Sequence, residues 1–166
     1  MKRTGFIYHP LYQKHETEPH PENPGRLQAI LDRLENSEDR PNLTELEPRK
    51  ALPEEIALVH DSAYISYVDE KCREGQTSLD MDTNISLNSY EAALLASGGG
   101  LTAVDKVIDG ELDNVFCAVR PPGHHAESNR ALGFCVYNNI AVGAAHALEK
   151  HDLKKEYVKT VERLKR

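Results

Sequence analysis

The apolar residues of this 166-residue chain fall into two kinds of pattern, and each predicts a different element. Compact runs, GFIY at residues 5–8 and NVFCAV at residues 114–119, predict strands, and a third short strand is predicted over residues 42–47. NVFCAV is apolar throughout, which is typical of a parallel strand covered on both faces. Elsewhere apolar residues recur three and four positions apart, which predicts helices. The predicted helices cover residues 24–34, 53–74 with a break around His60 and Asp61, 89–108 and 139–148.

This alternation of helices and strands indicates an α/β fold built on a parallel sheet. Residues 98–100 are three consecutive glycines inside the helix predicted over residues 89–108. Each helical glycine costs roughly 1 kcal/mol relative to alanine, so we expect close packing on a neighbour to compensate. A phosphate-binding loop is the alternative, but the run lacks a preceding strand and a following Lys-Ser/Thr.

Composition narrows the class of protein. With 39% hydrophobic and 28% charged residues and no long apolar run, the chain is expected to be soluble, cytoplasmic and without a membrane span. Its three cysteines lack C-x-x-C spacing, which fits reduced thiols. The net charge is −7; the segment from residue 149 onward has seven Lys or Arg against four Asp or Glu, so it carries +3 and the rest −10. An acidic body argues against nucleic acid as a partner.

The segment RPPGHHAESNRALGFCVYNN, residues 120–139, carries the candidate chemistry. It follows the last predicted strand, and ligands of open parallel sheets bind beyond the carboxyl ends of the strands. His124 and His125 could divide acid and base work, because imidazoles titrate near neutral pH. Adjacent side chains on an extended loop point away from each other, so a backbone bend at Gly123 is required to bring both rings to one substrate. The competing interpretation of a His-His pair alone is two exposed loop residues without a functional role.

RPPGHHA followed by GFCVYNN resembles the signature of the histone deacetylase and acetylpolyamine amidohydrolase superfamily. The resemblance extends, in the same order along the chain, over HPENPGR (20–26), VHDSAYI (59–65), DTNISLNSYEAALLASGGG (82–100) and on to about residue 155. It implies a three-layer αβα arrangement of the arginase-deacetylase type, of which this chain would hold the N-terminal part. It also implies zinc-dependent hydrolysis of acetyl-lysine or acetylated polyamines.

Carried over by position, the resemblance makes His125 the general base and His124 mainly an electrostatic contributor. Gly133 and Phe134 would line the channel for the acyl-lysine arm, with Cys135 beside them.

Tyr8 and Arg26 would border an internal cavity that releases acetate, a role in which a guanidinium suits a carboxylate product. Plain packing, or a surface ion pair for Arg26, is the competing interpretation. At the rim, where the family often has an Asp that grips substrate, the aligned residue is Ser62, with Asp61 one position earlier.

The resemblance also implies that zinc is bound by an Asp-x-His motif and a later Asp, and that a Tyr contacts the oxyanion. This chain shows neither the zinc-binding motif nor that Tyr. Instead, Leu153, Tyr157, Val161 and Leu164 predict a basic amphipathic helix, so we divide the chain into residues 1–148 and a C-terminal helix, 149–166. His151-Asp152 is not predicted to bind metal. A zinc site of Cys117, His124, His125 and Cys135 would match no common spacing.

Two hypotheses follow. In the first, the chain is a deacetylase-family protein whose catalytic half is missing from this polypeptide, inactive alone and left with an unpaired sheet edge that invites self-association. In the second, it is a non-catalytic module that binds acyl-lysine or polyamine or serves assembly, or a half-enzyme completed by a partner chain.

Overall fold

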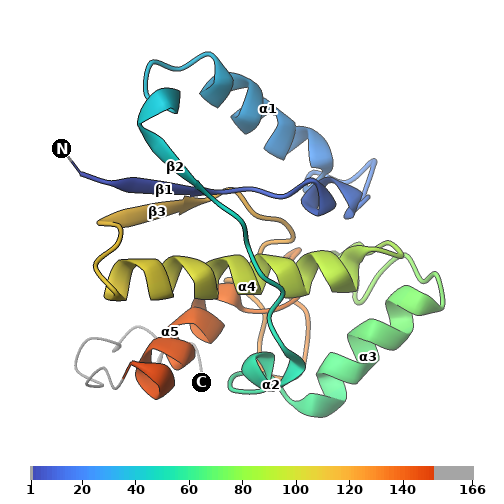
Figure 1. Cartoon of the computed structure of the whole chain (residues 1–166). Coiled ribbons are helices and arrows are strands. Elements are labelled where there is room, and N and C mark those ends of the chain that lie inside the picture. The colour runs from blue at the N-terminus through green and yellow to red at the C-terminus, as the bar shows by residue number, and fades with distance from the viewer. Residues whose placement is uncertain (1, 152–166) are drawn as a thin grey trace.

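A parallel sheet of three strands lies at the centre of the computed structural model, which describes residues 2–151. The strands β1 (Thr4–Ile7), β2 (Leu43–Leu46) and β3 (Asn114–Cys117) are arranged in the order β2-β1-β3, so β1 pairs with both others. Thr4 lies opposite Leu43 on one side and opposite Asn114 on the other. The predicted parallel sheet is confirmed, and all three strands end on the same side of the molecule, at the right of Figure 1.

Helices lie on both faces of this sheet, which confirms the predicted α/β class (Figure 1). The helix α1 (Pro24–Glu35) covers one face, and α4 (Ser89–Ile108) crosses the other. On the far side of α4 lie α2 (Pro53–Ile56), α3 (Ser62–Arg73) and α5 (Asn139–Lys150). Two 3-10 helices complete the arrangement, η1 (Pro10–Lys14) and η2 (Arg40–Asn42).

Local sequence explains where the helices begin. Asn23 precedes Pro24 and its side chain accepts a hydrogen bond from the Gly25 amide, so α1 starts with a capped turn. Asn138 caps α5 in the same way through the Ala141 amide. The predicted break between two helical stretches lies between α2 and α3, and Asp61 is the N-cap residue of α3, although its side chain makes no capping hydrogen bond.

Two of the three glycines in the run of α4, Gly98 and Gly99, are needed for close packing, as predicted for the run. A Cβ on Gly98 would lie 1.9 Å from the Arg49 carbonyl oxygen, and one on Gly99 would lie 3.2 Å from Ile7 Cγ2. The chain that leads into α2 therefore runs directly against one side of α4, while the sheet packs on another. This double contact explains why α4 is buried over most of its first half.

The prediction that residues 114–119 form a strand covered on both faces is wrong. The strand ends at Cys117, and its side chains at Asn114 and Phe116 are exposed, with Phe116 46% accessible. The physical reason is position: β3 is one of the two outer strands of the described sheet, and its main helical neighbour, α4, packs on one face only.

Two apolar clusters hold the layers together, one around Phe6, Tyr12 and Leu27 between α1 and the sheet, the other beyond α4 around Val68, Leu101 and Val136. Within residues 2–151, none of the helices has the length and apolar character needed to cross a lipid bilayer. The predicted C-terminal helix begins inside the last turn of α5; its remainder, with Leu153, Tyr157, Val161 and Leu164, lies outside the described residues.

Candidate active site

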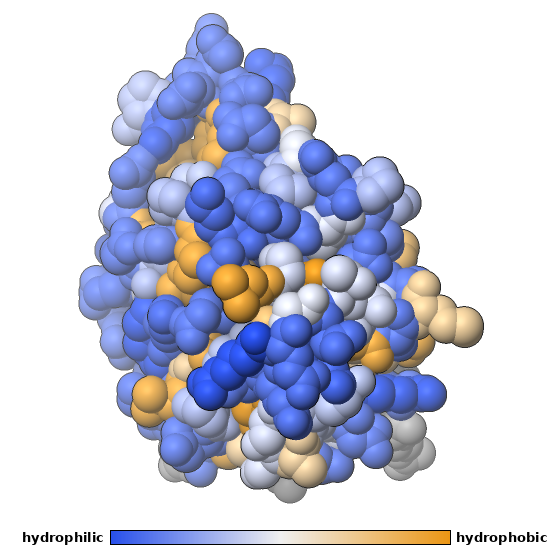
Figure 2. All heavy atoms as spheres, turned by 90° about the vertical axis from the view of Figure 1, so that its right-hand side faces the viewer, coloured by the Kyte–Doolittle hydropathy of each residue, from blue (hydrophilic) through white to orange (hydrophobic). Residues whose placement is uncertain are grey.

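His124 and His125 occupy the two central positions of a tight turn beyond the carboxyl end of β3. The Ala126 amide donates to the Gly123 carbonyl oxygen at 3.0 Å, which closes the turn. The two exposed imidazole rings consequently lie with their centroids 4.2 Å apart. The bend that a paired function requires is therefore present. Figure 2 views the side of the molecule where the strands end, and this face is mainly hydrophilic with small apolar groups near its centre.

The turn is fixed to the start of α5. A Cβ on Gly123 would lie 2.0 Å from the Tyr137 carbonyl oxygen, so glycine is required for this close backbone approach. Asn138 Nδ2 donates to the Ala126 carbonyl oxygen at 3.1 Å, while its Oδ1 caps α5. One side chain thus joins the histidine turn to a helix terminus.

Gly133 and Phe134 lie beside the histidine pair. Both have left-handed backbone conformations, with φ values of 57° and 70°, and the second is unusual for a residue with a side chain. A Cβ on Gly133 would lie 3.0 Å from His125 Cδ2, so Gly133 packs directly against that ring. Phe134 packs edge-on against His20 at 4.6 Å between ring centroids. Cys135 is fully buried next to them, and burial raises the pKa of its thiol.

A buried ion pair joins the two motifs that flank the site. Arg120 Nε and Nη2 donate to the two carboxylate oxygens of Glu22 at 2.6 and 2.8 Å, and Arg120 Nη1 donates to the Tyr12 carbonyl oxygen at 3.0 Å. His15 approaches the same carboxylate at 3.4 Å and hydrogen-bonds Ser89 Oγ at 2.6 Å. Both ionic side chains are nearly inaccessible, at 4% for Arg120 and 3% for Glu22.

Burial by itself would raise the pKa of Glu22, but hydrogen bonds with His15 and Arg120 outweigh it and lower that pKa to about 2. Burial lowers the pKa of His15, so this imidazole is neutral at pH 7. The pair therefore stays ionised at neutral pH and holds the HPENPG segment against the start of the histidine loop. Sequence reasoning missed both residues; the available signal was an ionisable residue inside each proline-rich motif.

Tyr8 and Arg26 lie in different environments. Tyr8 follows β1, is half-buried and lines a cavity of about 570 Å³ between α1 and β2, together with Gln28 and Leu31. Arg26 is exposed on α1 and does not line that cavity. The structure brings only Tyr8 to a cavity, and the acetate-release role of both residues stays a prediction.

The predicted rim residues, Asp61 and Ser62, are exposed at the start of α3. The Asp61 amide donates to the Ser128 carbonyl oxygen at 2.8 Å, which joins this end of α3 to the loop after the histidine turn. A groove of about 540 Å³ follows the same loop but is lined by other residues, among them Tyr64, Asp80 and Asp82. Sequence reasoning did not identify these two carboxylates.

The described residues do not form a metal site at the histidine turn. Within residues 2–151, the His, Cys, Asp and Glu side chains that converge in a group of three are Asp105, His146 and His151, and neither His124 nor His125 belongs to that group. The alternative set with Cys117 and Cys135 does not assemble either, over the same range. The zinc ion that the resemblance implies therefore does not fit the residues described at this turn.

Comparison with known proteins gives consistent matches. A family model described as "Histone deacetylase domain" matches residues 20–158. A "Probable deacetylase" of Archaeoglobus fulgidus is 39% identical over 142 residues, which cover 84% of this chain and 39% of the relative. The human "Polyamine deacetylase HDAC10" is 41% identical over 138 residues, 80% of this chain and 21% of the relative. A solved structure, "Crystal Structure of HDA15 HD domain", superposes with a TM-score of 0.83 at 32% identity and covers 89% of this chain and 44% of that one. The chain thus spans less than half of each of these proteins.

Proposed function

Because the chain belongs to the histone deacetylase family, we propose that its His124–His125 turn supplies the proton-transfer groups of a site that hydrolyses acetylated amines. The observation that carries this proposal is the turn itself: two exposed imidazoles in contact, beyond the carboxyl end of β3, with Gly133 packed under one of them. The resemblance to deacetylases supports the reaction class, and acetyl-lysine or an acetylated polyamine is the proposed substrate class.

In this reaction water adds to the acetyl carbonyl carbon, the C–N bond breaks, and acetate and a free amine are formed. His125 accepts a proton from the attacking water and later donates one to the leaving nitrogen. His124, with its ring in contact, stabilises the charge that develops on His125. The packing of Gly133 on His125 holds that ring in one orientation, and Phe134 offers an apolar wall for the methylene groups of the substrate.

Zinc, when bound in this family, activates water and polarises the carbonyl group. The ligands for it, and a donor to the oxyanion, would come from residues outside 2–151, because the described side chains do not gather three ligands at the turn. The proposed role of this chain is therefore to hold and orient the substrate and to protonate the leaving nitrogen. The histidine pair performs this role, and the Glu22–Arg120 ion pair stabilises the start of the histidine loop.

Hydrolysis of a fluorogenic acetyl-lysine peptide and of an acetylated polyamine tests the proposal. With added zinc, we expect the chain alone to show no turnover above a His125→Ala control.

A chimera provides the positive control, with the aligned segment of human Polyamine deacetylase HDAC10 replaced by the matching region of this chain, which is 80% of its length. We expect the chimera to hydrolyse acetylated polyamine and to lose at least about 100-fold in kcat with His125→Ala. A folded chimera whose activity does not depend on His125 would contradict the proposal.

A binding function is the second candidate, favoured by the groove that follows the histidine loop. Its acidic residues, Asp80 and Asp82, suit the ammonium groups of a polyamine or the flanking charges of a basic peptide. Calorimetry with N-acetylspermidine and with an acetyl-lysine peptide separates the two candidates. The binding function is favoured if the chain binds one of these ligands, if Asp82→Asn weakens that binding, and if the chimera shows no turnover. Absence of binding at millimolar concentration counts against the binding function.

A further inference from the structure

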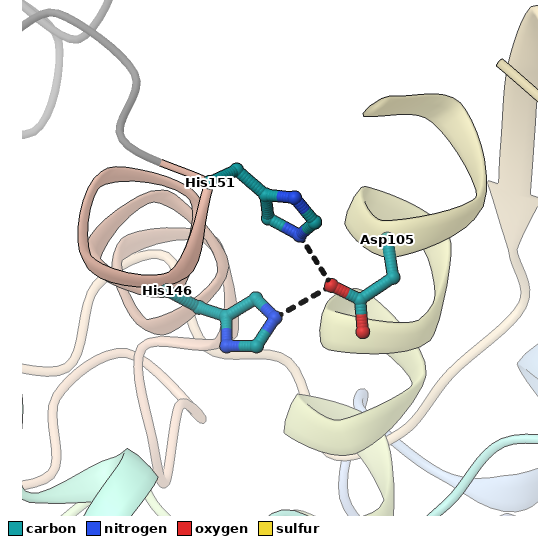
Figure 3. A group of neighbouring side chains, drawn as sticks. All are labelled: Asp105, His146 and His151. Atoms are coloured by element: carbon teal, nitrogen blue, oxygen red, sulfur yellow. Dashed lines mark hydrogen bonds and ion pairs between the residues drawn. The ribbon is translucent and has the colours of Figure 1, made fainter. Parts of the chain in front are cut away.

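Three metal-ligating side chains converge at the end of the molecule away from the histidine turn. Asp105 lies in the last turns of α4, His146 in α5, and His151 is the C-cap residue of α5. His146 Nε2 and His151 Nε2 each lie 2.7 Å from the same oxygen, Asp105 Oδ1 (Figure 3). The end of α5 thus aims two imidazole nitrogens at one carboxylate oxygen of α4.

This group is separate from the candidate active site. The histidine turn is fixed to Asn138, the N-cap residue of α5, whereas His151 caps the opposite end of the same helix. A helix of 12 residues is about 18 Å long at 1.5 Å per residue, so one helix length lies between the two places.

We propose that Asp105, His146 and His151 bind a divalent transition-metal ion of the Zn²⁺, Co²⁺ and Ni²⁺ class. Imidazole and carboxylate are ligands that these ions accept, and three protein ligands leave a fourth tetrahedral position for water. The ligand atoms all lie within 4.8 Å of one another. Metal–ligand bonds of about 2.0–2.1 Å place tetrahedral neighbours about 3.3 Å apart. The carboxylate oxygen therefore needs to withdraw by about 0.6 Å from each nitrogen, and the two nitrogens, which lie within 4.8 Å of each other, need to reach the same separation.

The surroundings suit this role. The side chain of His146 is 5% accessible, that of His151 14% and that of Asp105 24%, so the group is shielded but open on one side. Burial acts to raise the pKa of Asp105, and the hydrogen bonds with His151 and His146 outweigh it and lower that pKa. The carboxylate is therefore ionised, and among the described residues its second oxygen has no hydrogen-bond donor. The positions are rigid because α4 and α5 pack along each other, with a Cβ on Gly143 meeting Val104 Cγ2 at 3.6 Å.

A bound ion would fasten the end of α5 to α4. It would replace two hydrogen bonds: a neutral imidazole that donates through Nε2 shifts that proton to Nδ1, and a protonated imidazole releases it, so that Nε2 can coordinate. Since the ion binds the folded chain and not the separated helices, it raises the midpoint of thermal unfolding.

Titration of the tag-free full chain with Co²⁺ tests this, followed by its visible absorption and by the unfolding midpoint. We expect one Co²⁺ per chain with the strong absorption of tetrahedral coordination, displaced by Zn²⁺, and a raised midpoint. Asp105→Asn and His151→Gln should each weaken binding at least tenfold. A His124→Gln/His125→Gln chain is the matched control and should bind Co²⁺ as the original does.

Circular dichroism confirms that each variant is folded, and the partly exposed His151 is the substitution that disturbs packing least. Absence of saturable Co²⁺ binding overturns the proposal. Binding that is as tight in Asp105→Asn and His151→Gln as in the original chain also overturns it, and so does loss of binding in the His124→Gln/His125→Gln control. Hydrolysis is not measured in this experiment, so the outcome is independent of the proposed deacetylase role.

Discussion

At the scale of single residues, ion pairs with the same chemistry differ in what surrounds them. Glu22–Arg120 is almost completely buried, and three hydrogen bonds from the guanidinium reach Glu22 and the Tyr12 carbonyl. Glu127–Arg130 has equally short contacts, 2.8 Å at the closest, but both side chains are exposed. Water competes for the exposed pair and not for the buried one, so only the buried pair can fix the loop geometry.

Glu22→Gln is expected to destabilise the fold by roughly 3–5 kcal/mol, because it leaves the Arg120 guanidinium buried without its counter-charge. Urea unfolding monitored by circular dichroism measures this change. The matched variant Glu127→Gln removes an exposed partner and should change the free energy of unfolding little. Equal effects of the two substitutions would show that Glu22 has no special supporting role.

The pH dependence of stability is expected to come from His15 and His60. Burial lowers the pKa of both in the folded state, so below the ordinary value of about 6.5 the unfolded chain binds more protons than the folded one. Their stabilising effect is complete above that pH and is lost as the pH falls. The free energy of unfolding should therefore be lower at about pH 5.5 than at about pH 7.5. Glu22 does not contribute in this window, since its stabilising effect declines only below the ordinary carboxyl range.

Urea unfolding at both pH values measures the difference. His60→Gln should reduce it, because this variant lacks one of the two buried imidazoles. A pH dependence unchanged in His60→Gln would assign the effect to other groups.

At the scale of elements, α4 contains one glycine that packing requires and, two residues later, another that packing does not require. Gly98→Ala would place a methyl group 1.9 Å from the Arg49 carbonyl oxygen, a backbone atom. Gly100→Ala would place it 3.5 Å from the Asn139 carbonyl oxygen, an ordinary contact. The same substitution two residues apart therefore has opposite expected signs.

Thermal unfolding checks this pair. Gly98→Ala should destabilise by about 3 kcal/mol, at the upper end for overpacking, whereas Gly100→Ala should stabilise by about 0.5–1 kcal/mol through helix propensity. Stabilisation by both substitutions would mean that α4 shifts away from the Arg49 segment at little cost.

Elements with strong local signals were predictable from the sequence. The start of the first helix at residue 24, the start of the last at residue 139 and the break before α3 each depend on neighbouring residues, and the structure confirms them. The exposure of Phe116 was not predictable in the same way, because an apolar run looks alike in a central strand and in an edge strand. Strand order, which decides between the two, depends on contacts between residues more than 100 positions apart.

The residues of the candidate site also differ in how far the sequence could predict them. His124, His125, Gly133 and Phe134 were found from one contiguous motif, and the structure places them together. Glu22 and Arg120, like Asp105 and His146, come from distant segments. Their significance lies in a shared location, which no local pattern encodes.

At the scale of the whole molecule, the sheet of the described residues has two edge strands, β2 and β3. Over residues 2–151, β3 has a strand partner only in β1, and it exposes Phe116 next to its free edge. Unpaired strand edges with apolar side chains favour association with another chain.

We expect the chain to self-associate through β3 as its concentration rises, and Phe116→Lys to shift the equilibrium toward the monomer. Sedimentation velocity over a range of concentrations measures this. Ile140→Lys is the matched control, because Ile140 is also exposed, at 61%, but lies on α5 away from the sheet edge. If both substitutions act alike, general surface hydrophobicity rather than the strand edge drives association.

The central place of β1 sets an order in which the chain can fold. β1 precedes both of its partners along the chain, and one of them, β3, begins only at Asn114. During synthesis β1 and β2 can pair early, but the three-stranded sheet waits until β3 has been made. The histidine turn needs still more of the chain, since it is fixed by Asn138 at the start of α5. The groups proposed for catalysis are therefore ordered late, after most of the scaffold that supports them has been translated.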